Sequence, residues 1–297
     1  MRKMFFMLIF LGSLFTSNTF AQSRLGIFIG GGTTWYYGDM NDRIITSPKL
    51  FRTYFNGGLL YRLHSNWDLV ANVTFGKIVG ADSLAIQEFN RKRDLNFESK
   101  IFETCLLVNY KFLGERKKDG FRLNPYLIAG LGYLKFNPQT EFYGQKIDLQ
   151  PLGTEGQNVS GRGYPKPYKL YTLSIPLGIG VEIPLSKVFS LRIEYANHFT
   201  ISDYIDDIST KYADSTALAN GTNGTLAVQL ANNINTGYPR EGYGRGNPKQ
   251  RDSFSTLGIS LLFTPDFSNN GGNSSGGRNK GVIGKKKKHK KSCPAFN

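Results

Sequence analysis

Cysteine is scarce in this sequence, which holds only Cys105 and Cys293 among its 297 residues. Small exported domains that lack a large core are commonly held by several disulfide bridges. Two cysteines cannot supply such a framework. The fold must therefore be specified without one.

Long apolar runs are also missing, except at the N-terminus. There Arg2 and Lys3 precede an apolar segment over residues 5–15, and small residues follow at Thr19 and Ala21. This order is typical of a secretory signal, which we assign to residues 1–21. No other run approaches the roughly 20 apolar residues of a membrane-spanning helix. No cysteine follows the cleavage site, which argues against a lipoprotein, so we expect a periplasmic, cell-surface or outer-membrane protein.

Acidic residues are absent from the last 30 positions. That stretch contains eight lysines and arginines, and Arg2 and Lys3 in the signal add two more, which leaves +5 of the net charge of +15 for the rest of the chain. The basic charge is therefore local, and it gives no reason to expect a nucleic-acid partner.

The clearest pattern lies in residues 171–183, YTLSIPLGIGVEI, where every second residue is large and apolar or aromatic. A period of two predicts a strand with one apolar and one polar face. The segment is longer than the usual strand and suffices for a tilted strand to cross a bilayer, which needs roughly 9–11 residues. If the apolar face meets lipid, only a closed barrel pairs every backbone group.

Seven further segments alternate in the same way. They are residues 24–37, 50–63, 67–77, 96–112, 122–136, 187–200 and 253–264. Short connections (64–66, 113–121 and 184–186) alternate along the chain with long ones (38–49, 78–95, 137–169 and 201–252). Short turns at one end and long loops at the other are typical of outer-membrane barrels, whereas a lipocalin-like barrel turns its apolar face inward.

We therefore predict an all-β protein, an eight-stranded antiparallel transmembrane β-barrel of the OmpA/OmpX-like kind. The barrel occupies residues 22–266, and a disordered periplasmic tail with a Gly/Ser/Asn linker and a lysine-rich block occupies residues 267–297. The chain enters from the periplasm, so the long loops are expected outside the cell.

Aromatic residues are expected to form two girdles at the membrane interfaces. Those near the short turns are Tyr61, Trp67, Tyr110 and Phe112, and those near the long loops are Trp35, Tyr36, Phe51, Phe136, Phe199 and Phe254. An eight-stranded lumen is just wide enough for side chains to fill. The charged residues expected to pair and fill it are Arg62, Glu103, Lys111, Glu182, Arg192 and Glu194. Cys105 is expected beside them as a small filling residue.

Two weaker patterns suggest chemistry. His198 and Glu194 share one face of a strand, and with an inward Ser174 or Ser190 they could form the catalytic set of a lipid hydrolase. A single inward histidine is more often packed or paired, so no enzyme is expected. Asp203, Asp206 and Asp207 could bind Ca²⁺, but their spacing matches no closed calcium loop. Ordering of the long loop or plain solvation is favoured, and we expect no metal and no cofactor.

The tail leaves two alternatives open. The lysine block is either a docking peptide for an anionic partner or a solvated end. Because Cys105 is expected inside the barrel, a bridge between the two cysteines is doubtful. Cys293 is then a thiol for intermolecular pairing, or an idle one.

Four motifs together carry a resemblance to a known family. They are YYGDM at residues 36–40, DYIDDIST at 203–210, RGNP at 245–248 and the basic tail that ends in SCPAF at 292–296. In these the chain resembles the PorG-type outer-membrane barrels of the Bacteroidetes type IX secretion system.

The resemblance implies a non-enzymatic role. The partners it implies are a ring-forming periplasmic lipoprotein and its companion subunit, besides outer-membrane lipid. It also implies that Cys293 links the tail to the ring lipoprotein. The residues of the docking peptide would be Lys285, Lys286, Lys287, Lys288 and Phe296.

Overall fold

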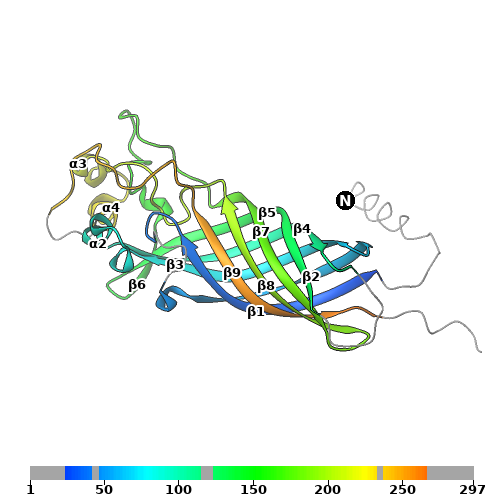
Figure 1. Ribbon diagram of the computed structural model, residues 1–297. Coiled ribbons are helices and arrows are strands. Elements are labelled where there is room, and N and C mark those ends of the chain that lie inside the picture. The colour runs from blue at the N-terminus through cyan, green and yellow to red at the C-terminus, as the bar shows by residue number, and fades with distance from the viewer. Residues whose placement is uncertain (1–23, 42–46, 115–122, 233–236, 266–297) are drawn as a thin grey trace, which may run out of the picture.

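Eight long strands close into one antiparallel barrel (Figure 1). The computed structural model describes residues 24–41, 47–114, 123–232 and 237–265. The barrel strands are β1 (Leu25–Tyr37), β2 (Arg52–His64), β3 (Trp67–Ala81), β4 (Asn96–Lys111), β5 (Asn124–Phe142), β7 (Tyr171–Pro184), β8 (Phe189–Thr200) and β9 (Ser253–Phe263). Each strand pairs with its neighbours, β1 pairs with β9, and β5 is followed by β7 around the wall. The predicted eight-stranded architecture is confirmed.

The barrel is apolar outside and polar inside, because the period-two pattern places alternate residues on opposite faces. Ile29, Phe55 and Leu131 on the outer face are 69%, 70% and 68% exposed. Asp68, Lys111 and other charged side chains on the inner face are almost fully buried. In water this outer surface would cost free energy in proportion to its apolar area, so lipid is its natural surrounding.

Two strands run farther than the sequence predicts. We expected β3 to end at residue 77 and β5 at 136, but they end at Ala81 and Phe142. Beyond the barrel rim β5 turns back into the short strand β6 (Gln145–Asp148). This hairpin stands above the rim at the end of the long loops (Figure 1).

The long loops carry the helices that the structure describes. These are α2 (Glu88–Arg93), α3 (Ser215–Ala219) and α4 (Gly224–Ala231), with single 3-10 turns at Pro48–Leu50, Asp82–Leu84 and Gln150–Leu152. All three helices gather at one end of the barrel (Figure 1). Among the described residues, no helix has both the length and the apolar character needed to cross a membrane. These elements were not predicted from the sequence, because each is too short to show a helical period.

A compact loop layer covers this end of the barrel. Its largest apolar cluster combines Tyr36 and Phe97 from strand ends with Ile205 and Ile208 from the loop after β8. A separate apolar cluster of Phe28, Leu60, Val70 and Leu262 lies inside the lumen. The loops therefore have a core of their own.

The aromatic girdles are only partly as expected. Near the short turns, the rings of Trp67 and Tyr110 lie 4.7 Å apart. Near the long loops the prediction is wrong for Tyr36, Phe136 and Phe254, which are at most 3% exposed. Their strand positions have the inward parity, and at this height the loop layer replaces lipid as their neighbour.

Both ends of the barrel chain lie at the same rim. β1 begins and β9 ends at the end of the molecule away from the helices (Figure 1). The expected signal at residues 1–21 and the tail at 267–297 lie outside the described residues.

Candidate functional site

Paired charges close the lumen near the short turns. The Lys111 ammonium lies 2.8 Å from a carboxylate oxygen of Asp68 and 3.0 Å from one of Glu182. Arg62 adds a second cation 3.2 Å from Glu182. Four strands contribute these groups, because each side chain sits at an inward position near its strand end. Such pairing offsets the cost of burying each charge.

Arg192 forms a second layer beside this group. Its guanidinium pairs with Glu194 and donates a 3.0 Å hydrogen bond to the Tyr126 hydroxyl. It also lies over the Phe28 ring, 5.0 Å from the centroid. The expectation that lumenal charges pair with one another therefore holds for these residues, and paired side chains occupy the space that a pore would need.

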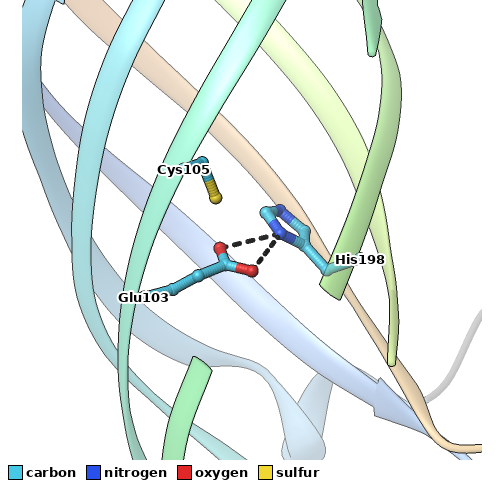
Figure 2. Close-up of side chains that lie close together, drawn as sticks. All are labelled: Glu103, Cys105 and His198. Atoms are coloured by element: carbon cyan, nitrogen blue, oxygen red, sulfur yellow. Dashed lines mark hydrogen bonds and ion pairs between the residues drawn. The ribbon is translucent and has the colours of Figure 1, made fainter. Parts of the chain in front are cut away.

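His198 pairs with Glu103 and not with Glu194 (Figure 2). The His198 Nδ1 lies 2.8 Å from Glu103 Oε2, and the Ser174 hydroxyl donates to Glu103 Oε1 at 2.6 Å. A hydrolytic triad needs the histidine between serine and acid, so that it can take the serine proton. Here the acid lies between the other two, and the Ser174 hydroxyl donates to the carboxylate and not to the imidazole. Ser190 lies near the start of β8 and His198 near its end, so neither serine forms a triad with His198.

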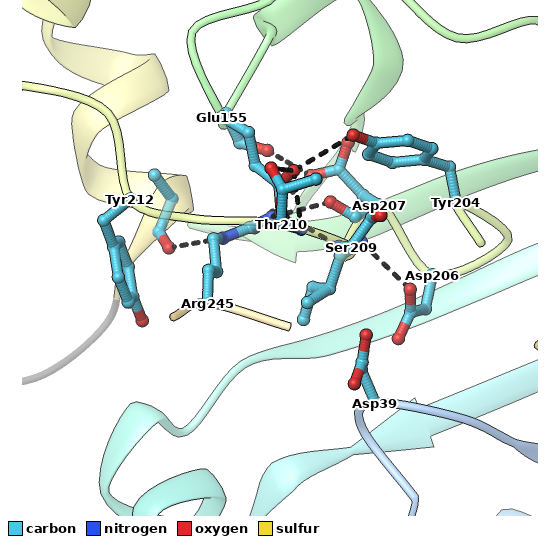
Figure 3. A network of polar contacts seen from close by, with 12 residues as sticks. Asp39, Glu155, Tyr204, Asp206, Asp207, Ser209, Thr210, Tyr212 and Arg245 are labelled. Atoms are coloured by element: carbon cyan, nitrogen blue, oxygen red, sulfur yellow. Dashed lines mark hydrogen bonds and ion pairs between the residues drawn. The ribbon is translucent and has the colours of Figure 1, made fainter. Parts of the chain in front are cut away.

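Arg245 organises the loop layer (Figure 3). Its guanidinium lies 3.1 Å from Glu155 Oε1 and 3.4 Å from Asp207 Oδ2, and it donates to the Asp207 carbonyl at 2.6 Å. Glu155 in turn accepts from the Ser209 amide at 2.9 Å and the Thr210 hydroxyl at 2.6 Å. This buried network joins the loop before β7 to the loop after β8.

Asp39 and Arg93 extend the network to the first two long loops. The Asp39 carboxylate accepts from the Asn247 amide at 3.0 Å. Arg93 pairs with Asp82 at 2.7 Å and donates to the carbonyls of Asp39 and Arg245. The three loop motifs YYGDM, DYIDDIST and RGNP, which are far apart in sequence, therefore meet in one cluster.

Two carboxyl groups share a single phenol. The Tyr36 hydroxyl lies 2.8 Å from Asp206 Oδ2 and 2.6 Å from Asp252 Oδ1. The Tyr36 hydroxyl has one proton and can donate it to only one of the two carboxyl groups. A proton bound to the other carboxyl group supplies the second hydrogen bond. Burial raises the pKa of both aspartates well above the ordinary value, and repulsion from Asp39 adds to this for Asp206 and repulsion from Asp206 for Asp252, which favours that extra proton.

Burial also raises the pKa of other loop-layer acids. The pKa of Asp39 and of Asp207 rises to about 6, and that of Asp203 to about 7. For Asp207 the Arg245 guanidinium opposes the effect without cancelling it. These acids therefore change charge in or just below the neutral range.

The aspartates considered for Ca²⁺ do not converge on one point. Asp206 turns toward Tyr36, whereas Asp207 accepts from the Thr154 hydroxyl at 2.6 Å and the Tyr168 hydroxyl at 2.7 Å. Asp203 accepts from the Ser209 hydroxyl of its own loop at 2.8 Å. The hydrogen bonds of these aspartates order the loop and attach it to β1 and to the loop before β7.

Sequence reasoning missed Glu155, Asp82 and Arg93 in this site. The one local signal is the GTEG segment around Glu155, where Gly153 and Gly156 adopt positive φ angles of 64° and 86°. Such backbone is typical of a tight turn that presents a side chain. The expected partner-binding residues lie outside the described residues: Cys293, Lys285, Lys286, Lys287, Lys288 and Phe296.

Fold and lumen together define the class, an eight-stranded transmembrane β-barrel with a plugged interior and a folded loop layer. A family model described as a domain of unknown function (DUF6089) matches residues 2–225, so the chain belongs to that family. No curated protein matches the sequence.

Several solved outer-membrane barrels are similar at low identity. Neisserial surface protein A (NspA) is 9% identical with a TM-score of 0.39, over 82% of this chain and 98% of that one. A major outer membrane protein from Thermus thermophilus is 11% identical with a TM-score of 0.37, over 80% and 98%. Ail, the attachment invasion locus protein of Yersinia pestis, is 13% identical with a TM-score of 0.34, over 80% and 97%.

Proposed function

We propose that this protein is a non-enzymatic outer-membrane component of a type IX secretion machine. In this role its C-terminal tail anchors a periplasmic lipoprotein ring to the outer membrane. The observation that carries the proposal is the position at which the last barrel strand ends. β9 ends at Phe263 on the short-turn rim, opposite the loop layer, which supports a tail on that side of the membrane.

The orientation follows from export. If the chain enters from the periplasm, the short-turn rim faces the periplasm and the loop layer faces the outside. The tail with Cys293 and the lysine block then starts in the compartment of the proposed ring. The same compartment is oxidising, which allows Cys293 to form a disulfide with a partner.

The plugged lumen favours anchoring over conduction. Lys111, Asp68, Glu182 and Arg192 fill the barrel with groups that are paired and buried. A barrel filled in this way contributes its rims, its lipid-facing wall and its tail to an assembly.

Non-reducing gels of isolated outer membranes test the proposal. Wild type should show a high-mass species that reductant removes, and Cys293→Ser should abolish it. The matched variant Cys105→Ser should retain it, because Cys105 is buried in the lumen. Mass spectrometry of the band should identify a periplasmic lipoprotein. Monomer alone in every lane would contradict the covalent tether.

A structural or adhesive surface barrel is the second candidate, and one observation favours it. The loop layer has an open surface pocket of about 550 Å³ lined by Tyr164, Pro165, Tyr212 and Glu241 among others. A space of this size with aromatic and charged walls suits an external ligand. On this alternative, deletion of residues 268–297 would leave secretion unchanged.

A further inference from the structure

Three metal-binding side chains converge inside the barrel. Glu103 and Cys105 are two residues apart on the inner face of β4, and His198 reaches them from β8 across the lumen (Figure 2). One donor atom from each lies within 4.8 Å of the other two. All three side chains are buried. The functions discussed so far use none of these groups as a metal ligand.

The Glu103 carboxylate has neutral or titratable partners in place of a fixed cation. Among the residues that the structure describes, no lysine or arginine forms an ion pair with it. Its Oε1 atom accepts from the Ser174 hydroxyl at 2.6 Å and lies 3.1 Å from His198 Nδ1, whereas the buried Oε2 atom receives no hydrogen bond, although His198 Nδ1 lies 2.8 Å away. A buried carboxylate requires a counter-charge. Either a proton on His198 or a bound cation can supply it.

The surroundings hold the two nitrogen and oxygen donors in place. His198 Nε2 lies 3.3 Å from the Thr256 hydroxyl, and the His198 ring stacks on Phe254 with centroids 4.4 Å apart. The Ser174 hydroxyl holds Glu103 Oε1 at 2.6 Å, and Oε2 lies 2.8 Å from His198 Nδ1 without accepting a hydrogen bond. Metal-binding histidines and carboxylates generally have such outer partners, which fix their orientation.

Gly132 on the neighbouring strand β5 leaves space for the three donor side chains. A Cβ atom at Gly132 would lie 2.8 Å from Cys105 Sγ and 3.1 Å from Glu103 Oε1, and closer still to the Ser174 hydroxyl. A side chain there would push the donors apart. A cavity of about 40 Å³ beside His198 and Thr256 can also hold a water molecule.

We propose that Glu103, Cys105 and His198 form a transition-metal site in the lumen, with Zn²⁺ as the ion that best suits the donors. A thiolate, an imidazole and a carboxylate are all zinc ligands, and water can complete a tetrahedron. The sulfur donor disfavours Mg²⁺ and Ca²⁺, which prefer oxygen. Binding displaces the thiol proton to solvent. The ion would tie β4 to β8 across the barrel.

Cobalt binding to the full-length protein tests the site. The protein is extracted from outer membranes in detergent, its bound metal is counted by elemental analysis, and chelator-stripped protein is titrated with Co²⁺ alone. Wild type should bind one ion per chain and show the near-ultraviolet absorption of a cobalt thiolate. Cys105→Ser should lose that absorption, and His198→Gln should lose the ion.

Matched variants separate this site from other ligands in the chain. Cys293→Ser and His64→Gln make the same chemical changes elsewhere in the chain, and both should bind as wild type does. The proposal is overturned if folded wild type takes up no metal, or if the thiolate absorption survives Cys105→Ser and disappears in Cys293→Ser. Heat-modifiable migration on gels confirms that each variant is folded.

Two milder substitutions test the site if Cys105→Ser does not fold. Thr256→Val removes the partner of His198 Nε2 and should weaken Zn²⁺ binding about 10–100-fold. Ser260→Ala removes another buried hydroxyl of β9, one without a hydrogen-bond partner, and should have no effect. Equal affinities for Thr256→Val and wild type would overturn His198 as a ligand. The site does not depend on the proposed secretion role, so either can fail alone.

Discussion

Arg245 is the residue on which the loop layer depends most. Its guanidinium is buried and is balanced by Glu155, 90 positions earlier, and by Asp207. Removing one partner of a buried ion pair leaves the other charge without compensation, which costs more than the pair itself contributes. The side chain therefore controls the order of several loops.

Arg245→Ala should loosen the loop layer and leave the barrel closed. The expected cost is about 3–5 kcal/mol of local stability, since Glu155 and Asp207 lose their counter-charge. Limited proteolysis of intact outer membranes should show faster cleavage in the loops. Arg240→Ala, at an exposed position of the same loop, is the control. Equal cleavage rates in the two variants would contradict the role of Arg245.

Some residues of this network could be found from the sequence and others could not. Asp39, Asp206 and Arg245 stood out because they belong to the motifs on which the family resemblance rests. Glu155 did not, because its ion pair with Arg245 spans 90 positions, and Arg93 did not, because its pair with Asp82 spans 11 positions and follows no strand or helix period. The lumenal pair of Glu103 and His198 shows the same limit. Each was expected to face inward, but their contact depends on barrel closure.

Among the elements, the loop that joins β8 to β9 contains buried aspartates whose pKa values are raised. Its Asp203 and Asp207 have pKa values raised to about 7 and about 6, chiefly by burial. The unfolded loop releases these protons near the ordinary value of 3.8. Between that value and about 7 the folded loop therefore binds more protons than the unfolded one.

The loop layer should accordingly lose stability as pH rises from about 4 to about 7. Amide hydrogen exchange of residues 201–252, corrected for the intrinsic pH dependence, should show the greatest protection at the acidic end. Asp203→Asn mimics the protonated group and should flatten part of this slope. Protection that rises with pH over the same range would contradict the prediction.

Barrel strands were predictable because their pattern is local. Alternation over ten or more residues identifies a strand whatever it pairs with, and the short turns fix antiparallel order. The helices α2, α3 and α4 were missed since they are at most eight residues long. The aromatic positions Tyr36 and Phe254 were misplaced because sequence alone does not show where lipid ends and the loop layer begins.

At the scale of the whole molecule, the barrel is complete without the tail. All strand pairs that close it lie between Leu25 and Phe263. Deletion of residues 268–297 should therefore leave heat-modifiable migration and loop protection unchanged, and should abolish the reducible high-mass species. A deletion variant that fails to assemble would show that the tail contributes to folding.

The distribution of charge around the wall bears on how such a barrel can enter a membrane. The first and last strands, β1 and β9, contain no charged residue, and they form the pair with the greatest separation in sequence. The ion pairs Lys111–Asp68 and Arg192–Glu194 lie within β3, β4 and β8 and need no contact with that seam. An open, curved sheet can thus neutralise these charges first. When β1 then pairs with β9 and closes the barrel, only glycine, hydroxyl-bearing and apolar residues of these two strands have to pass the lipid.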